Sequence, residues 1–237
     1  MRYYENGDLY SYLDESMEIL CWRDILDILW GISTGLNFIH EHDLVHGHLH
    51  GGNILIEMIE NEEAVDAKIA GTGLHGPADV SSQQIYGVIP FIAPEIFDGN
   101  APTKAADIYS FGMIMWMLST RIRPYCDRPH DLQLIQEIIS GLRPNVINGT
   151  SSVFAKLIFE CLDPNPLNRP SISQLKEHLE NWITEIYDDS DPSDLSDQFD
   201  VVEQINLENL KFNNDLSCHE KAIYFSRPLN PFFYGQM

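Results

Sequence analysis

The segment from residue 104 to residue 120 constrains the fold most, because it predicts a helix that is apolar on nearly every side. Between Phe111 and Leu118 no polar face is left that could point to water. A helix of that kind must lie in the middle of a core, surrounded by other elements. Thr103 precedes it and is a suitable N-cap. We therefore predict a domain built around this helix.

Helical spacing of apolar residues predicts further helices around that centre. The longest covers residues 21–40 and should be buried along one face, and three others cover residues 131–140, 152–161 and 172–187. Near the N-terminus, Asp8 is a candidate cap for a short helix.

Two short apolar runs, residues 54–58 and 67–70, flank an acidic turn at residues 60–63 and predict a β-hairpin. Residues 71–94 have no helical period, and a segment of this length without regular structure usually has a function or is mobile. The sequence therefore predicts an α+β fold that is predominantly α-helical, with one small hairpin.

The charge of the chain excludes two classes of partner. Its formal net charge is −22 over 237 residues, which opposes nucleic-acid phosphates and anionic membranes. No apolar run approaches the roughly 18 residues needed to span a bilayer, and the N-terminal residues lack the pattern of a signal peptide. We therefore expect a cytoplasmic protein in which the four isolated cysteines remain free thiols.

The C-terminal part of the chain differs in composition from the rest. Residues 188–200 are rich in Asp and Ser and predict a disordered acidic linker. Ser190, Ser193 and Ser196 lie among acids, which makes them candidates for phosphorylation, with a plain solvated spacer as the alternative. Residues 201–237 form a tail whose aromatic end either docks back on the domain or contacts a partner.

A loop dense in histidine and glycine lies between the long helix and the hairpin, at residues 44–53. Rigid elements flank it on both sides, which is typical of a functional loop. Five histidines in and just before this loop fall within eleven residues. Imidazole suits Zn²⁺, so a metal site is one interpretation. These histidines are His40, His42, His46, His48 and His50.

The order of several motifs along the chain resembles that of protein kinases. Residues 46–53, His-Gly-His-Leu-His-Gly-Gly-Asn, resemble the kinase catalytic loop H-R-D-L-x-x-x-N. Further motifs follow in the kinase order: residues 69–74 at the place of the D-F-G metal loop, residues 93–95 as A-P-E, residues 107–112 as D-x-W/Y-S-F-G, and residues 161–170 as the C-W-x-x-D-P-x-x-R-P of tyrosine kinases and tyrosine-kinase-like kinases. The resemblance covers residues 1–187 and implies the fold of the kinase C-terminal lobe.

The resemblance implies which residues would act in phosphoryl transfer. In kinases the loop aspartate accepts the substrate proton, and the loop asparagine and the D-F-G aspartate hold Mg²⁺ on the ATP phosphates. Here Asn53 is kept, His48 stands at the position of the catalytic base, and Gly71 stands at the lost metal-ligand position. Gly47 replaces the loop arginine, and Thr72 replaces the D-F-G phenylalanine. ATP and Mg²⁺ are implied by the family, whereas the groups that bind them are depleted.

The resemblance also implies which residues hold the lobe together, and these are kept. Glu95 and Arg169 occupy the positions of a buried ion pair, and Asp107 should cap the loop backbone around His46. A kept scaffold with depleted chemistry is typical of a pseudokinase that binds proteins in signalling. We expect residues 131–142 and the aromatic tail to contact such partners.

The start of the chain resembles the hinge between the two kinase lobes. Residues 3–9, Tyr-Tyr-Glu-Asn-Gly-Asp-Leu, fit this hinge, and no Gly-rich loop or strand lysine precedes them. We expect a longer protein whose N-terminal lobe is absent from this sequence, with a lobe that stands alone as the alternative. Leu55 would form the floor of the nucleotide site. Two other functions stay open, namely an active Ser/Thr or Tyr kinase that uses His48 as its base, and the metal-binding loop.

Overall fold

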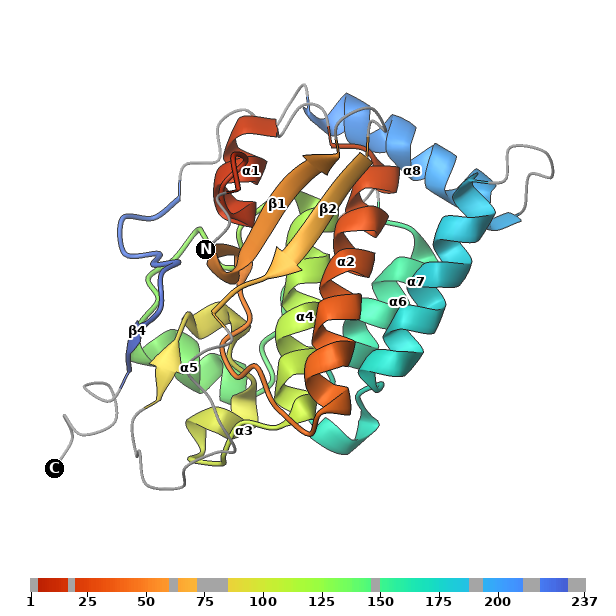
Figure 1. Ribbon diagram of the computed structural model, residues 1–237. Helices are drawn as coiled ribbons and strands as arrows, with labels where there is room; N and C mark the ends of the chain where they lie inside the picture. Colours follow the sequence, from red (N-terminus) through yellow and green to blue (C-terminus); the bar gives the residue numbers. More distant parts are fainter. Residues whose placement is uncertain are drawn as a thin grey trace, which may run out of the picture.

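The computed structural model describes residues 4–16, 20–59, 64–71, 85–145, 150–187, 194–210 and 218–229. Helices dominate, and a small antiparallel hairpin lies across them on one side (Figure 1). The predicted α+β class, predominantly helical with one hairpin, is confirmed.

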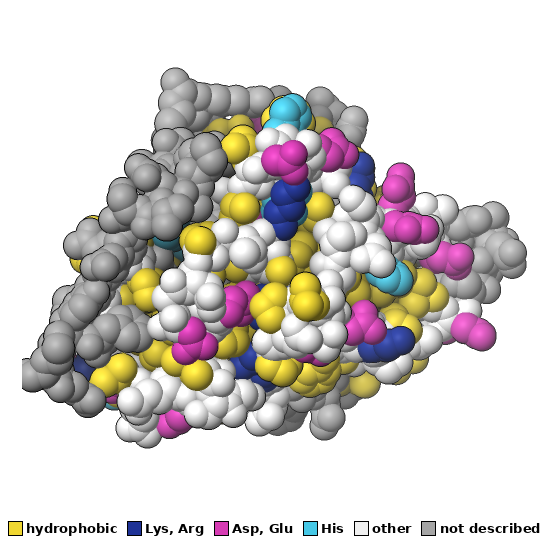
Figure 2. Space-filling view, turned by 90° about the horizontal axis from the view of Figure 1, so that it is seen from below, with side chains coloured by type: hydrophobic (Ala, Val, Ile, Leu, Met, Phe, Trp, Pro, Cys, Tyr) yellow, Lys and Arg dark blue, Asp and Glu magenta, His cyan; other side chains and the backbone are white. Residues whose placement is uncertain are grey.

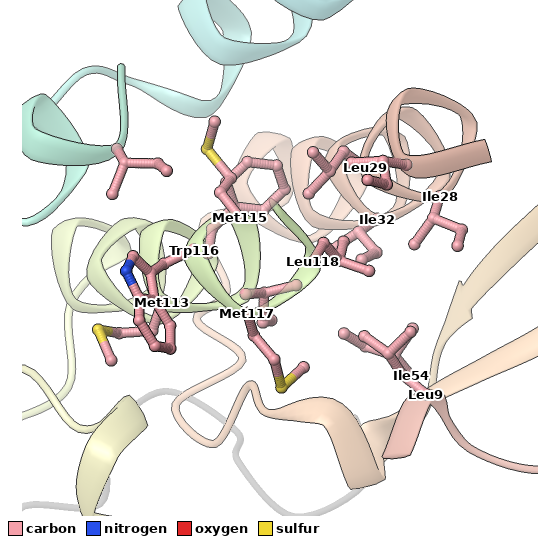
Figure 3. Packing of buried hydrophobic residues seen from close by; sticks show 14 of the residues in the cluster. Leu9, Ile28, Leu29, Ile32, Ile54, Met113, Met115, Trp116, Met117 and Leu118 are labelled. Carbon is pink, nitrogen blue, oxygen red and sulfur yellow. The ribbon is translucent and has the colours of Figure 1, made fainter. Parts of the chain in front are cut away.

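Helix α4 (Lys104–Thr120) forms the centre of the domain, as its composition predicts. Every side chain from Ala106 to Thr120 is buried, and the Thr103 hydroxyl caps the helix by accepting a hydrogen bond from the Ala106 N–H at 3.2 Å. Figure 3 shows side chains of α4 packed beside those of the long preceding helix and the first strand. On another side α4 meets α6 (Ser152–Cys161) so closely that a Cβ on Gly112 would lie 2.6 Å from the Cys161 Cβ. Only glycine permits that approach.

Helix α2 (Trp22–Glu41) packs between the hairpin and α7 (Ile172–Tyr187) (Figure 1). The hairpin pairs β1 (Ile54–Ile59) with β2 (Ala64–Ile69) in antiparallel register. A Cβ on Gly31 of α2 would lie 2.8 Å from the Ala67 carbonyl oxygen, so helix and strand are in direct backbone contact. The second strand begins earlier than the predicted residue 67, and the turn at residues 60–63 lies outside the described residues.

The N-terminal segment runs along the edge of the hairpin into α1 (Leu9–Ser16). Asp8 caps this helix, because its Oδ1 accepts a hydrogen bond from the Ser11 N–H at 2.8 Å. Just before the cap, the Gly7 carbonyl accepts a hydrogen bond from the Ile56 N–H at 3.1 Å. The segment is therefore a short backbone neighbour of β1, and the predicted Asp8 cap is present.

A second, smaller apolar cluster surrounds α5 (Leu132–Ile139), α3 (Pro94–Phe97) and the 3-10 turn η3 (Ile89–Phe91). Asp131 caps α5 by accepting hydrogen bonds from two backbone N–H groups, at 3.1 and 3.2 Å. Figure 2, seen from below, shows acidic side chains spread among hydrophobic ones over that face of the molecule. The buried members of this cluster are Ile89, Ile92, Phe97, Leu134, Ile135, Ile138 and Leu229.

Helix α8 (Asp194–Leu210) corrects the prediction of a disordered linker over residues 194–200, the described part of the predicted stretch 188–200. The buried Phe199 ring lies 5.1 Å from the Trp22 ring, measured between centroids, and the backbone N–H of Trp22 donates to the Glu203 carboxylate at 2.9 Å. The acidic composition misled the prediction because apolar residues of this helix pack on α2 and α7. Residues 188–193 lie outside the described residues.

The C-terminal tail docks on the domain over residues 218–229, which is one of the two predicted alternatives. It ends in β4 (Arg227–Pro228), which pairs antiparallel with β3 (Tyr86–Gly87) beside α5 (Figure 1). The aromatic residues at 232–234 lie outside the described residues, as do Ser190 and Ser193. Ser196 lies in the first turn of α8.

Two expectations from composition also bear on the structure. Among the helices that the structure describes, none has the length and apolar character needed to cross a membrane. All four cysteines are free thiols, as predicted, with Cys126 and Cys161 buried and Cys218 exposed.

Candidate functional site

Asp107 fixes the backbone of the histidine loop from the first turn of α4. Its Oδ2 accepts a hydrogen bond from the His46 N–H and its Oδ1 accepts one from the Gly47 N–H, both at 2.8 Å. The buried His40 donates from Nε2 to the same carboxylate at 2.9 Å. Three donors compensate a carboxylate that is 1% exposed, so the expected contact between Asp107 and the loop is present and well satisfied.

His46 links the loop to the segment that follows β2. Its Nε2 lies 2.9 Å from the Ala70 carbonyl oxygen. Because a carbonyl only accepts, Nε2 carries the proton and Nδ1 is left to accept the His48 N–H at 3.3 Å. His46 therefore acts as a buried bridge between two chain segments.

Asn53 and Gly71 lie side by side where the loop meets the end of β2. The Ala70 N–H donates to the Asn53 carbonyl at 2.8 Å, and a Cβ built on Gly71 would lie 3.2 Å from Asn53 Oδ1. The Asn53 Nδ2 donates to the His48 carbonyl at 2.8 Å. A side chain at position 71 would therefore point at the Asn53 amide, but Gly71 supplies none.

His48, the residue at the base position, has its backbone held on both sides and its imidazole directed toward β3. The direction follows from the position of His48 Nδ1, which would lie 3.7 Å from a Cβ added at Gly87. A neutral imidazole is able to accept a proton, so the assignment of His48 to the base position stays a prediction.

The Glu95–Arg169 pair ties α3 to the chain around η4 (Pro166–Asn168). Two parallel hydrogen bonds join the guanidinium to the carboxylate, Nη1 to Oε1 at 2.7 Å and Nη2 to Oε2 at 2.8 Å. The same guanidinium donates to the carbonyls of Ala105 and Asp163, each at 2.9 Å. The Arg169 side chain is fully buried, so the pair is a bidentate and satisfied buried contact.

Comparison with known proteins decides the family. A family model described as protein tyrosine and serine/threonine kinase matches residues 1–179. This chain belongs to the protein kinase family. It is 30% identical over 181 residues to the probable serine/threonine-protein kinase pats1 of Dictyostelium discoideum, covering 75% of this chain and 6% of that protein.

Two other kinases show the same pattern of similarity. The probable serine/threonine-protein kinase drkA of Dictyostelium discoideum is 28% identical over 190 residues, which is 79% of this chain and 29% of that protein. Serine/threonine-protein kinase STY17 of Arabidopsis thaliana is 24% identical over 183 residues, which is 77% of this chain and 32% of that protein. The chain thus spans less than a third of the length of these relatives.

ATP and Mg²⁺ are the cofactors that kinase membership implies, and the described side chains do not fit the metal. Mg²⁺ prefers hard, charged oxygens in octahedral geometry. At the meeting point of loop and β2 the described residues offer one neutral amide oxygen, from Asn53, and a glycine. Thr72 lies outside the described residues. Leu55 lies half-buried in β1, where it bridges to Asp8, and its role as a nucleotide floor stays a prediction.

The alternative of a histidine metal site finds no support in the geometry. His40 donates to Asp107, His46 to the Ala70 carbonyl, and His42 contacts the Phe38 carbonyl at 2.8 Å. These side chains point to separate partners. Within the described parts of the chain, no group of three His, Cys, Asp or Glu residues is placed to hold a metal ion.

His50 has a role in this kinase domain that the sequence did not indicate. Its Nδ1 accepts the Gly52 N–H at 3.1 Å, so Nε2 carries the proton and donates to the Ser226 hydroxyl of the tail at 3.0 Å. Burial, together with the neighbouring His46 and His48, lowers the pKa of His50 to about 4. The neutral imidazole joins the catalytic-loop region to a segment 176 residues away, and no local pattern predicts such a contact.

Proposed function

We propose that this kinase domain is a pseudokinase, which binds proteins in signalling and does not transfer phosphate. The observation that carries the proposal is Gly71, which has no side chain at the position where a Cβ would lie 3.2 Å from the Asn53 amide oxygen. Phosphoryl transfer depends almost entirely on positioned metal ions and charges around the phosphates. A site with one neutral ligand has lost most of that stabilisation.

The contrast with the scaffold supports a retained binding role. Asp107 and Arg169 keep full sets of partners, so the lobe retains the contacts that stabilise its shape. The motif at residues 161–170 favours the tyrosine-kinase-like branch. A domain that keeps its shape while its chemistry is depleted is suited to present surfaces to other proteins.

The test is a thermal shift titration with Mg·ATP, followed by a phosphotransfer assay with labelled ATP. We expect no Mg²⁺-dependent rise in melting temperature and no label incorporation by the full chain. His48→Ala should behave like the unmodified chain, and so should His42→Ala, the matched control at an exposed histidine that contacts the Phe38 carbonyl.

A second candidate, an active kinase that uses His48 as its base, rests on the fixed loop backbone and on the direction of the imidazole. Label incorporation that His48→Ala abolishes and His42→Ala retains would overturn the pseudokinase proposal and establish this candidate.

A further inference from the structure

The docked tail, residues 218–229, covers a continuous surface of the kinase domain. At its start, backbone contacts hold it against the connection between α4 and α5. The His219 N–H donates to the Cys126 carbonyl at 2.7 Å, and the His130 N–H donates to the Lys221 carbonyl at 3.0 Å. The buried His130 ring also accepts the Ile223 N–H on Nδ1 at 3.0 Å. Over the first half of the tail, its main chain therefore makes the hydrogen bonds to the domain.

In the middle of the tail an aromatic side chain enters the surface. The Tyr224 hydroxyl donates to the Pro124 carbonyl at 3.0 Å, and its ring lies 5.8 Å from the Tyr10 ring in an edge-to-face arrangement. The Arg123 guanidinium lies 5.4 Å from the centre of the Tyr224 ring. Phe225, the next residue, is 67% exposed and points away. The surface therefore suits an aromatic side chain at position 224 and makes little contact with the side chain at position 225.

The last described residues form a strand and an apolar anchor. Arg227 donates from Nη2 to the His130 carbonyl at 2.6 Å. The Leu229 N–H donates to the Ile85 carbonyl at 2.8 Å, and the Leu229 side chain is fully buried beside Leu134 and Ile138 of α5. Pro228 between them is exposed, so inward and outward side chains alternate as in a strand added to a sheet edge.

The apolar face of α5 belongs to residues 131–142, the region expected to meet partners. In the structure Leu229 and apolar side chains from the segment before α5, among them Ile89 and Phe97, form one buried cluster with that face. A partner therefore has to compete with the chain's own tail for it. The competition is feasible because β3 and β4 pair over only two residues each, and isolated pairs of that length are marginal in water.

We propose that the surface under residues 218–229 is a binding site for an extended peptide of a partner protein, with the tail as its internal competitor. The occupant that fits is an aromatic residue followed, three to five positions later, by Arg, Pro and an aliphatic residue, as in Tyr224 and residues 227–229. Main-chain pairing with alternating side-chain pockets is the mechanism of strand addition. The net charge of −22 favours the basic residue in such a peptide. This inference rests on the proposed binding function.

The experiment uses the full chain and a fluorescein-labelled peptide of residues 218–229 that carries Cys218→Ser, with fluorescence anisotropy as the readout. Leu229→Ser in the chain removes the buried anchor, and Phe225→Ser is the matched control because it removes an exposed apolar side chain from the same tail. The tail is a tethered competitor with an effective concentration up to the millimolar range. Its release by Leu229→Ser should therefore tighten peptide binding at least about tenfold. Phe225→Ser should bind the peptide as weakly as the unmodified chain.

Changes in the peptide test the pockets. A peptide with Leu229→Ser should lose at least about tenfold in affinity for the released chain, and one with Phe225→Ser should keep it. Equal affinity of the peptide for the unmodified and released chains would overturn the proposal, and so would equal binding of both altered peptides. If Leu229→Ser lowers the cooperativity of thermal unfolding, Arg227→Ala replaces it as the releasing variant.

Hydrogen exchange of the unmodified chain provides a measurement that needs no variant. The amides of Ile223 and Leu229 should exchange faster than those of α4, because a displaceable tail opens without global unfolding. Exchange as slow as that of α4 would overturn the proposal. All binding runs omit nucleotide, so the peptide result is independent of phosphotransfer. Label incorporation alone would overturn the pseudokinase proposal and leave the peptide site intact.

Discussion

The buried charges of Asp107 and Arg169 each meet several partners, whereas the described side chains at Asn53 and Gly71 offer only neutral groups. The difference separates what the fold needs from what the chemistry needs. A buried charge that loses its partner is costly, so the charges of Asp107, Glu95 and Arg169 are retained with their partners. A charged side chain at the metal position would bind Mg²⁺ and would not be needed as the partner of another residue. Its loss therefore leaves the fold intact.

The largest expected effect is at the Glu95–Arg169 pair. Arg169→Met should lower the free energy of unfolding by about 3–5 kcal/mol, because it leaves the Glu95 carboxylate largely buried without its partner. Urea denaturation at neutral pH measures it. The double variant Arg169→Met with Glu95→Leu should recover part of the loss, since no unpaired charge remains. A single-variant loss below about 1 kcal/mol would remove the distinction between the charged scaffold residues and the metal position.

A smaller effect should come from the pH dependence of His50. Its pKa is about 4 in the folded protein and ordinarily 6.5, so the unfolded chain binds more protons between these values. The free energy of unfolding should therefore fall as the pH drops below 6.5, with a contribution from His50 of about 2 kcal/mol between about pH 7 and about pH 5.

The variant His50→Asn isolates this contribution, because it removes the titrating group. Its stability should depend less steeply on pH than that of the unmodified chain, whereas His42→Asn, at an exposed histidine, should keep the full slope. Identical slopes for His50→Asn and the unmodified chain would mean that burial does not lower the pKa of His50.

The smallest effect is expected at Gly71, the metal-ligand position that has lost its charged side chain. Gly71 has a left-handed backbone (φ +78), so Gly71→Asp should cost about 1 kcal/mol of stability from backbone strain and contact with Asn53. Gly99→Asp is the matched control, because Gly99 is also left-handed (φ +88) but has open space around it. Urea denaturation with and without Mg²⁺ measures both variants.

Stabilisation of Gly71→Asp by Mg²⁺, without an effect on Gly99→Asp, would show that the position needs only a carboxylate to hold the metal again. Equal behaviour of the two variants in Mg²⁺ would mean that the metal geometry has been lost beyond this one residue.

Much of the fold was predictable because it depends on local patterns. The spacing of apolar residues located α2, α4, α6 and α7, and the capping residues Asp8 and Thr103 located the starts of α1 and α4. The contact of Asp107 with the loop followed from the family motif, because the motif conserves spacing between segments that fold together. The linker at residues 188–200 was predicted from its composition, rich in Asp and Ser, and this prediction failed over residues 194–200, where α8 begins.

The sequence by itself determined the family, the all-round burial of α4 and the loss of a charged side chain at Gly71, since motifs, periodicity and residue type are local properties. Only the tertiary structure decided where the C-terminal part lies. Phe199 packs against the Trp22 ring, and Glu203 forms a hydrogen bond with Trp22, which is 181 residues away in the sequence. Ser226 forms a hydrogen bond with His50, which is 176 residues away. Such contacts depend on which surfaces the rest of the fold leaves uncovered. That is a property of the assembled core, which no single segment carries.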